Sequence, residues 1–209
     1  MLYRPHGKRA LDLALVIPAG ILLAPVAAAV AAAVAATQGR PVLFTQRRVG
    51  RDDAEFTLYK FRTMVEDAER SGAGLWFTRD DPRVTPLGRV LRSWSLDELP
   101  QLWNVLRGDM SIVGPRPKPR EIVDRYRSRY LPTLAVPPGL TCYTAIRGRN
   151  RLRRSQMIAY DREYVRDAGL LTDLSVILRT IPVVLLRTGF QAEDESEEWI
   201  EDVPAEAGG

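Results

Sequence analysis

Residues 13–36 read LALVIPAGILLAPVAAAVAAAVAA, a run of 24 residues without a charged side chain. A straight helix of that length extends for about 36 Å, enough to cross the roughly 30 Å hydrocarbon core of a bilayer. The run therefore predicts a membrane-embedded helix, and this helix decides the fold class to be expected.

Three arrangements of this segment compete. A cleaved signal peptide would use Lys8 and Arg9 as its basic start. The run is too long for that, and no disulfide framework follows, since Cys142 is the sole cysteine. A spanning helix is the simplest membrane arrangement. However, Arg47 and Arg48 follow the run while Lys8 and Arg9 precede it, and basic flanks at both ends favour keeping both ends in the cytoplasm.

Two prolines make a re-entrant helix feasible. Pro25 removes a backbone hydrogen bond near the middle of the run, and Pro18 adds a second weak point. A helix bent there enters one leaflet and returns, and Asp12, beside Lys8 and Arg9, would then lie paired at the level of the lipid headgroups. From the residues alone, the spanning and the re-entrant arrangements both stay open.

The charge is unevenly distributed along the 209 residues. Residues 191–209 carry eight acidic side chains and no Lys or Arg, which leaves 30 basic against 18 acidic residues before them. A basic body predicts anionic partners such as nucleic acid, nucleotide phosphates or anionic lipid. We expect a membrane helix over residues 1–38, a catalytic globular domain with interfacial helices over 39–190, and a disordered acidic tail.

The scarcity of two residue types excludes several chemistries. His6 is the sole histidine and Cys142 the sole cysteine. A Ser–His–Asp hydrolase, a Cys–His enzyme and a zinc site built on histidines are therefore improbable. Any reaction must rely on carboxylates, Arg and Lys.

The remaining body shows short elements of both kinds. Residues 42–61 predict a β-hairpin, 63–71 a helix, and 80–88 a loop with turns. One later helix has an apolar face with the spacing i, i+3, i+4 and i+7, formed by Leu99, Leu102, Trp103 and Leu106.

Two further segments are amphipathic. Residues 120–131 place apolar side chains on one side and arginines between them, which predicts either a core-packing helix or a helix on the membrane surface. Residues 170–190 are strongly apolar but contain Asp173 and Arg179. These charges argue against spanning and favour an interfacial or partly buried helix.

Asp97 and Glu98 are adjacent carboxylates at a helix start. Ser95 and Glu98 fit a capping box, and Asp97 would then be a first-turn acid that the helix dipole favours. If Asp97 itself caps the helix, Pro100 falls in the first turn, where it costs no hydrogen bond. Capping and catalysis both stay open, because a helix start also attracts phosphate.

Arg116 stands between Pro115 and Pro117 in the sequence Gly-Pro-Arg-Pro. The prolines stiffen the backbone, so the segment predicts either a rigid surface turn or a guanidinium pre-organised to bind phosphate. Further candidates for binding an anionic ligand are Lys60, Arg62, Arg89, Arg92, Arg147, Arg149 and Arg151.

Several of these stretches together resemble the bacterial sugar transferase family, the small monotopic phosphoglycosyl transferases. The resemblance covers about residues 8–190 and rests, in order, on Lys8-Arg9-x-x-Asp12, PVLFTQRRVG, FTLYKFRTM, DPRVTPLGRVLR, SLDELPQLWNVLRGDMSIVGPRP, PPGLT, GRN and Asp161-x-x-Tyr164. It implies a re-entrant helix broken at Ser-Pro, where this chain has Ala24-Pro25, on the cytoplasmic face of the bacterial membrane. Cys142-Tyr143 stands where the family usually has Gly-Trp.

The resemblance also implies a reaction. Asp97 would be the nucleophile and Glu98 its catalytic neighbour, with Mg²⁺ bound by both carboxylates and Arg116 and Arg92 holding phosphate charge. Asp97 would attack the sugar-bearing phosphorus of a UDP-sugar and expel UMP, and a polyprenyl phosphate would then take the phosphosugar. Two alternatives are direct attack by the lipid in a ternary complex and a non-enzymatic, membrane-anchored basic binding module.

The expected fold class is α+β and mainly helical, with a helix-break-helix membrane hairpin and a small cytoplasmic domain containing a short β-hairpin and amphipathic interfacial helices. The expected partners are a UDP-sugar, polyprenyl phosphate and membrane lipid, not nucleic acid, and a homodimer is compatible with this prediction.

Overall fold

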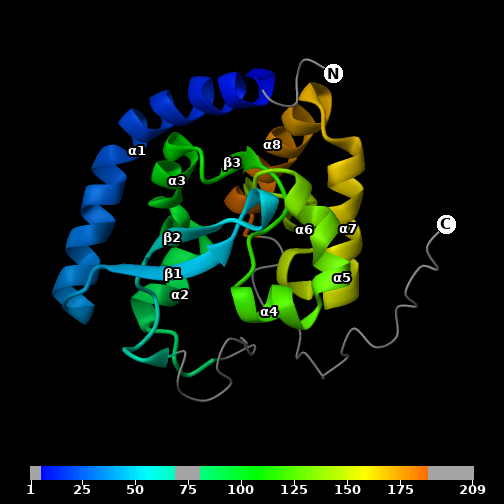
Figure 1. Ribbon diagram of the computed structural model, residues 1–209. Coiled ribbons are helices and arrows are strands. Elements are labelled where there is room, and N and C mark those ends of the chain that lie inside the picture. Colours follow the sequence, from blue (N-terminus) through cyan, green and yellow to red (C-terminus); the bar gives the residue numbers. More distant parts are fainter. Residues whose placement is uncertain (1–5, 69–80, 188–209) are drawn as a thin grey trace.

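The computed structural model describes residues 6–68 and 81–187. The described chain is mainly helical, with two small sheets near the middle of the molecule (Figure 1), as the predicted α+β class requires. The helices are α1 (Lys8–Gln38), α2 (Pro86–Ser93), α3 (Gln101–Arg107), α4 (Arg120–Arg125), α5 (Arg127–Tyr130), α6 (Tyr143–Ile146), α7 (Arg154–Asp167) and α8 (Leu170–Leu185). The strands are β1 (Leu43–Val49), β2 (Glu55–Phe61), β3 (Ser111–Val113) and β4 (Gly139–Thr141). Short 3-10 turns are η2 (Arg51–Asp53), η4 (Leu96–Glu98), η5 (Leu131–Ala135) and η6 (Arg149–Arg151).

The apolar run forms α1, a single helix of 31 residues with Pro18 and Pro25 inside it. Figure 1 shows this helix running along the top of the molecule and then turning down its left side. The predicted break at Ala24-Pro25 is wrong as an interruption of the helix. A proline removes one hydrogen bond and crowds the preceding turn, which bends a helix without ending it when both arms are held by packing.

Both arms of α1 pack on the rest of the chain. Val16 lies in a buried cluster with Phe56, and Val34 lies in another with Leu91. Within the described ranges, α1 is the one helix long and apolar enough to cross a membrane. Its outward side exposes four large apolar residues, Ile17, Ile21, Leu22 and Val26.

The predicted hairpin over residues 42–61 is confirmed. β1 and β2 pair antiparallel, and the turn between them is the 3-10 turn η2. Asp52 and Asp53 have positive φ angles of 56° and 63°, a region that short polar side chains tolerate better than most. The second sheet, the parallel pair β3–β4, was not predicted.

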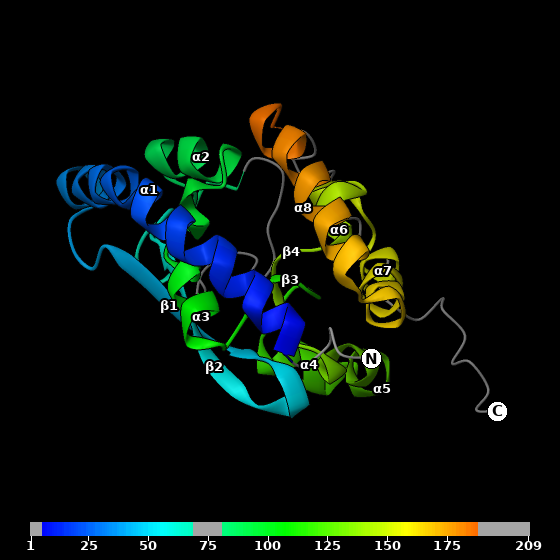
Figure 2. The ribbon, with the colours of Figure 1, turned by 90° about the horizontal axis from the view of Figure 1, so that it is seen from above.

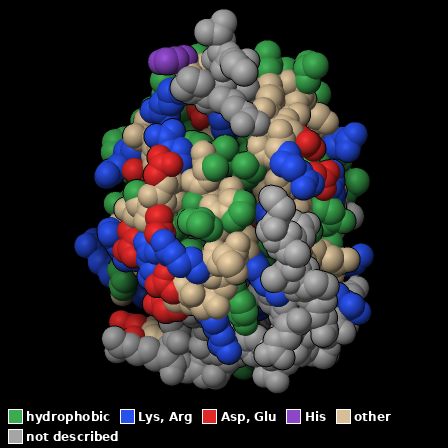
Figure 3. All heavy atoms as spheres, turned by 45° about the vertical axis from the view of Figure 1, so that its right-hand side comes forward, with side chains coloured by type: hydrophobic (Ala, Val, Ile, Leu, Met, Phe, Trp, Pro, Cys, Tyr) green, Lys and Arg blue, Asp and Glu red, His purple; other side chains and the backbone are tan. Residues whose placement is uncertain are grey.

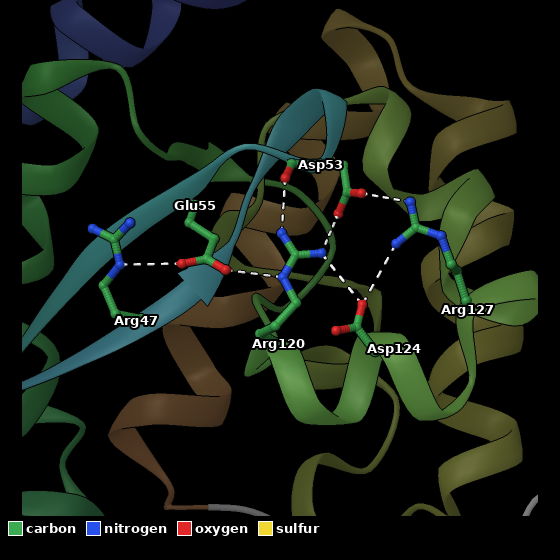
Figure 4. A network of polar contacts seen from close by, with 6 residues as sticks. All are labelled: Arg47, Asp53, Glu55, Arg120, Asp124 and Arg127. Atoms are coloured by element: carbon green, nitrogen blue, oxygen red, sulfur yellow. Dashed lines mark hydrogen bonds and ion pairs between the residues drawn. The ribbon is translucent and has the colours of Figure 1, made fainter.

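A network of ion pairs ties the hairpin turn to α4 and α5 (Figure 4). Asp53 accepts hydrogen bonds from Arg120 at 2.7 Å and from Arg127 at 2.6 Å. Glu55 accepts from Arg120 at 2.9 Å and from Arg47 at 3.2 Å. Figure 3 shows basic and acidic side chains interleaved, with apolar side chains among them, on the face that Figure 1 shows at its right-hand side.

The helix predicted over residues 63–71 is wrong for the part that is described. Met64 forms an isolated bridge with Val84, and the backbone N–H of Val65 donates to the carbonyl oxygen of Arg83 at 2.8 Å. The left-handed Asp67 then turns the chain. Backbone groups that bond to a distant segment cannot also form the ladder of a local helix; residues 69–71 lie outside the described part.

Of the loop predicted over residues 80–88, the part over residues 81–85 is confirmed, while residue 80 lies outside the described part. The helix α2 begins at Pro86, where a missing N–H costs no hydrogen bond, and the Thr85 hydroxyl caps it by accepting from the backbone N–H of Gly88 at 2.9 Å. A Cβ added to Gly88 would lie 2.0 Å from the carbonyl oxygen of Thr63. Glycine therefore allows this helix to press against the chain that follows β2.

Residues 120–131 form two short helices rather than one. α4 ends at Arg125 and α5 begins at Arg127, because Tyr126 leaves the helical region with φ −126° and ψ 38°. Ile122, Val123 and Tyr130 are buried in a cluster with Val49 and Ile158. Of the two alternatives for this segment, core packing is confirmed.

The helix α8 is partly buried, as predicted for residues 170–190. Asp173 and Val176 face the protein and are each 1% exposed. The other side exposes Leu171, Leu174, Leu178, Ile181, Leu185 and Leu186. Figure 2 shows α1 and α8 beginning near each other and then diverging across the same side of the molecule.

A buried ion pair joins the starts of these two helices. The Lys8 ammonium donates to Asp173 Oδ2 at 2.6 Å and to the Tyr164 hydroxyl at 2.9 Å. Asp12 accepts from Ser111 Oγ and from the backbone N–H of Ile112, both at 2.9 Å.

Lys8 and Asp12 are both buried in the protein, 5% and 4% exposed, and Asp12 is bonded to Ser111 and Ile112 rather than to its basic neighbours; the level of these residues relative to the lipid headgroups stays a prediction. Arg9 instead donates to the carbonyl oxygens of Val105 and Leu106 at the end of α3. Cations are favoured there by the negative end of the helix dipole. All three residues thus hold the start of α1 to the body of the protein.

Candidate active site

The carboxylates of Asp97 and Glu98 belong to η4, a single turn between α2 and α3. Ser95 introduces this turn with left-handed angles of φ 56° and ψ 21°, and its side chain makes no capping bond. An N-cap residue is normally extended, so the predicted capping box is wrong. Capping by Asp97 is wrong as well, since α3 begins at Gln101, four residues later.

Glu98 is the acceptor for two cations. Its Oε1 lies 2.7 Å from Lys60 Nζ on β2 and 3.0 Å from Arg116 Nη2 on the loop after β3. Asp97 makes a looser ion pair, with Oδ2 at 3.8 Å from the same Lys60 nitrogen, and is 6% exposed. The structure thus brings together Lys60, Asp97, Glu98 and Arg116, which the sequence separates by up to 56 positions.

The pKa values of the two carboxylates are shifted in opposite directions. Burial raises the pKa of Asp97, and the charge of Glu98 adds to this effect, while Lys60 opposes it. Burial also acts to raise the pKa of Glu98, but the charges and hydrogen bonds of Lys60 and Arg116 outweigh it and hold that pKa well below the ordinary value. Neighbouring carboxylates whose pKa values are driven apart are suited to different tasks.

Arg92 and Arg149 complete the positive surroundings. Arg149 Nη2 donates to Ser95 Oγ at 2.8 Å, which places it against the turn that carries Asp97. Burial lowers the pKa of both guanidinium groups, and the charges of Asp97 and Glu98 act against that shift. The site therefore combines two carboxylates with four cations and has a net positive charge.

The Pro-Arg-Pro loop is fixed by the small parallel sheet. Gly114 donates to the carbonyl oxygen of Thr141 at 3.0 Å, and Gly139 donates to that of Pro115 at 2.9 Å. A Cβ on Gly114 would lie 2.3 Å from the carbonyl oxygen of Pro137, so only glycine permits this approach. The loop is rigid, as one alternative required, and it also presents Arg116 to Glu98.

Asp161 on α7 contacts the backbone of this loop. Its carboxylate accepts a hydrogen bond from the Arg116 backbone and is 1% exposed. Burial raises its pKa to about 7, although Lys118 acts to lower it. Burial likewise lowers the pKa of Lys118 to about 8. Asp161 was noted in the sequence only as part of a motif, because a helix residue far along the chain gives no local sign of its neighbours.

A solvent-open hollow lies over Glu98. It is lined by Arg48, Leu58, Lys60, Glu98, Gln101, Arg116, Pro117 and Gly139. Sequence reasoning missed Arg48 and Gln101. The alternation of side chains along the hairpin could have indicated Arg48. Arg48 pairs with Phe56, and Phe56 lies on the same face of β2 as Lys60.

Two predicted substrate-binding residues are not brought to this hollow. Arg62 donates to the carbonyl oxygens of Gln38 and Gly39 and so closes the end of α1. Arg147 donates to both carboxylate oxygens of Glu163 at 2.5 and 2.7 Å.

Arg147 is also enclosed by aromatic rings. Its guanidinium lies 4.4 Å from the ring centre of Tyr143 and 4.7 Å from that of Tyr160. Tyr143, one of the two departures from the family pattern, is buried and stacks edge-on with Tyr164 at 5.6 Å between ring centres. Tyr143 therefore belongs to the core, and Cys142 beside it is buried too.

The carboxylates of η4 are candidate ligands for a divalent cation. No group of three or more His, Cys, Asp or Glu side chains occurs among the described residues. Mg²⁺ does not require one, because it is commonly held by one or two carboxylates together with substrate phosphates and water. Asp97 and Glu98 fit that mode of binding, with Asp97 the carboxylate less engaged by protein cations.

Comparison with known proteins gives a family match over nearly the whole chain. The family described as "Bacterial sugar transferase" matches residues 3–187. The exopolysaccharide production protein ExoY of Sinorhizobium fredii is 40% identical over 203 residues, covering 89% of this chain and 90% of that protein.

Two relatives have names that specify a reaction. The UDP-N-acetylgalactosamine-undecaprenyl-phosphate N-acetylgalactosaminephosphotransferase of Aeromonas hydrophila is 36% identical over 196 residues, covering 88% of this chain and 44% of that protein. The undecaprenyl-phosphate galactose phosphotransferase of Salmonella typhimurium is 37% identical over 165 residues, covering 72% of this chain and 35% of that protein. This chain therefore spans less than half the length of these two relatives.

Proposed function

The chain belongs to the bacterial sugar transferase family, and from this premise we propose that it transfers a phosphosugar from a UDP-sugar to a membrane polyprenyl phosphate. As a member with undecaprenyl-phosphate sugar phosphotransferases among its relatives, it is an enzyme, a phosphoglycosyl transferase. The proposed products are a polyprenyl-diphosphate-sugar and UMP. The similarity to ExoY supports a place in exopolysaccharide production.

The observation that carries this proposal is the pair of carboxylates among four cations. A diphosphate is an anion, so its approach to a carboxylate requires compensating positive charge. Lys60 and Arg116 bond to Glu98, and among the described residues Asp97 has only a long ion pair, with Lys60. This arrangement keeps the cations in place through Glu98 while Asp97 is available to react.

In the proposed first step, an oxygen of ionised Asp97 attacks the phosphorus that carries the sugar. The bond from this phosphorus to the oxygen shared with UMP breaks, and UMP leaves with the electron pair. An acyl phosphate joins Asp97 to the phosphosugar. Arg116 and Lys60 offset the charge that develops on the phosphoryl oxygens.

In the second step, an oxygen of the polyprenyl phosphate attacks the same phosphorus. The bond to Asp97 breaks, which restores the carboxylate and releases the polyprenyl-diphosphate-sugar. The two substrates thus react in turn, with ping-pong kinetics. Direct attack of the lipid on the UDP-sugar in a ternary complex would give sequential kinetics instead.

Mg²⁺ is part of the proposal, held by Asp97 and Glu98 together with the diphosphate. When bound, it would neutralise phosphate charge and orient the leaving group. Glu98 stays ionised because its pKa is lowered by two cations, so it can serve as a ligand at neutral pH.

We further propose that α1 enters the cytoplasmic leaflet and returns. Its bend, its proline content and its exposed apolar side support this, and the exposed side of α8 continues the apolar surface. A Cys introduced at Gln38 should resist an impermeant thiol reagent added outside intact cells and react after lysis. Labelling from outside would instead indicate that α1 spans the membrane.

The nucleophile is tested with Asp97→Asn in the full chain, with UDP-sugar and Mg²⁺ but no lipid acceptor. The wild type should release UMP and gain one phosphosugar on the peptide that contains Asp97, as seen by mass spectrometry. The variant should lose UMP release by at least roughly 1,000-fold. Asp124→Asn, at an exposed position in α4, is the matched control. UMP release by Asp97→Asn near the wild-type rate would exclude the assignment.

A further inference from the structure

Two buried amide side chains on the short helix α3 are used very differently. Asn104 is fully buried and its amide is paired within the protein. Its nitrogen donates to the carbonyl oxygen of Thr57 at 2.7 Å, and its oxygen accepts from the backbone N–H of Tyr59 at 3.2 Å. Asn104 therefore joins α3 to β2 and has a structural task.

Gln101, one turn earlier, is 3% exposed, yet its side-chain nitrogen has no hydrogen-bond partner among the described residues. A buried donor without a partner costs about 1–3 kcal/mol relative to a satisfied one. Native proteins rarely keep such a group without a use. Within the described structure, packing gives no hydrogen-bonding task to this nitrogen.

The position of Gln101 indicates what its side-chain nitrogen can bind. It lines the same hollow as Lys60, Glu98 and Arg116, and it follows Glu98 by three residues, a spacing that places side chains on one side of a helical turn. Lys60 and Arg116 each already donate to Glu98. Gln101 adds a neutral donor to a site whose other donors are charged.

We propose that the Gln101 side-chain nitrogen donates a hydrogen bond to a non-bridging oxygen of the phosphoryl group that is transferred. This inference rests on the proposed function. Phosphoryl oxygens only accept hydrogen bonds, so the amide must offer its nitrogen, the atom that lacks a partner. The phosphorus has to lie within reach of Asp97, next to Glu98, and Gln101 shares the hollow over Glu98.

The test uses Gln101→Met, which keeps the length of the side chain and removes its donor. UMP release should fall roughly 10- to 100-fold, mainly in kcat, since a hydrogen bond to a charged group is lost as charge develops. The thermal unfolding midpoint should stay equal to or exceed that of the wild type, because an unsatisfied buried donor is removed. Gln101→Glu, which brings a negative charge toward the phosphate, should lose more activity than Gln101→Met.

Asn104→Leu is the matched control on the same helix. It should lower the unfolding midpoint, since it leaves the Thr57 carbonyl and Tyr59 N–H without partners, while folded protein keeps kcat within about twofold. UDP-galactose, UDP-glucose and UDP-N-acetylgalactosamine are the probes. A contact to the phosphoryl group predicts the same fold loss in Gln101→Met for every probe that the wild type uses.

Three results would overturn the inference. Gln101→Met could retain wild-type kcat, could lose stability in parallel with activity, or could lose activity with one sugar only, which would assign the amide to the sugar. In each case the wild type still releases UMP, so the proposed function stands. A wild type that releases no UMP from any probe would instead overturn the proposed function and this inference with it.

Discussion

Two clusters of buried charge in this protein contain the same kinds of side chain and serve different ends. The anchor cluster, Lys8, Tyr164 and Asp173, joins α1 to α8. One cation meets one carboxylate at 2.6 Å, and the tyrosine hydroxyl bonds to both. The site cluster, Lys60, Asp97, Glu98 and Arg116, adjoins a hollow, and within the described part of the chain Asp97 has only the ion pair with Lys60 at 3.8 Å.

The two clusters differ in how fully their charges are paired rather than in how deeply they are buried. Every charge of the anchor cluster is matched, so its contribution is to fix how two apolar helices sit relative to each other. The site cluster carries more positive than negative charge once Arg92 and Arg149 are included. The pKa values of its two carboxylates are shifted in opposite directions. An incomplete cluster beside a hollow is prepared for a charged ligand.

The largest effect is expected from breaking the anchor cluster. Lys8→Met leaves Asp173 buried without its cation and should lower the free energy of unfolding by about 3–5 kcal/mol. Chemical denaturation in detergent measures this. The double variant Lys8→Met/Asp173→Leu should regain most of the loss, and a double variant as unstable as Lys8→Met would show that the pair itself is not responsible.

A substitution in the site cluster is expected to have a smaller effect in free energy than Lys8→Met, and to affect activity rather than stability. Arg116→Lys keeps the charge but loses the planar fork, so UMP release should fall roughly 10- to 100-fold while the unfolding midpoint changes little. Arg125→Lys, at an exposed position of α4, is the control. If Arg116→Lys instead unfolds the protein, the site cluster stabilises the fold as the anchor cluster does, and the two clusters do not differ in role.

The pH dependence of stability isolates Asp161, which supports Arg116. Its pKa is raised to about 7 in the folded protein, so between about pH 4 and pH 7 the folded state keeps a proton that the unfolded chain has lost. Stability from this group is therefore lost as the pH rises, by at most about 1.4 kcal/mol per pH unit. Asp161→Asn should flatten the curve between pH 5 and 7, as followed by denaturant titration; parallel curves for the two proteins would contradict the shift.

The smallest effect is expected at the surface network of Figure 4. Arg127 pairs with Asp53 at 2.6 Å, but its side chain is 50% exposed. Solvent screens such pairs, so Arg127→Ala should shift the unfolding midpoint by roughly 2 °C or less. Differential scanning calorimetry checks this, and a shift as large as that of Lys8→Met would show that complete pairing matters even in water.

Much of the fold could be predicted from local patterns. The apolar run gives a long helix, and alternation with a turn gives the hairpin, because burial of apolar side chains has a fixed period in each element. The helix over 63–71 failed in its described part, residues 63–68, since Met64 and Val65 pair with residues about 20 positions away. Local propensity carries no information about such a partner.

The candidate site was likewise predicted in part from local sequence and decided in part by the tertiary structure. Residue types and spacing were enough to single out Asp97, Glu98 and Arg116 as groups that could handle phosphate. Whether Asp97 caps a helix was decided by the left-handed Ser95 and by α3 starting later than the pattern suggested. Arg62 and Arg147 have the right chemistry but are held by α1 carbonyls and by Glu163.

By itself, then, the sequence predicted a basic, membrane-associated chain that must rely on carboxylates, Arg and Lys, and a carboxylate pair together with a stiff arginine loop. The tertiary structure alone decided which of the eight candidate cations reach that pair, that Lys8 and Asp12 are buried, and that Gln101, which lines the hollow, has a side-chain nitrogen without a partner among the described residues. The physical reason is that electrostatic attraction and hydrogen bonding act over a few ångströms in space, and the chain brings together residues that are many positions apart.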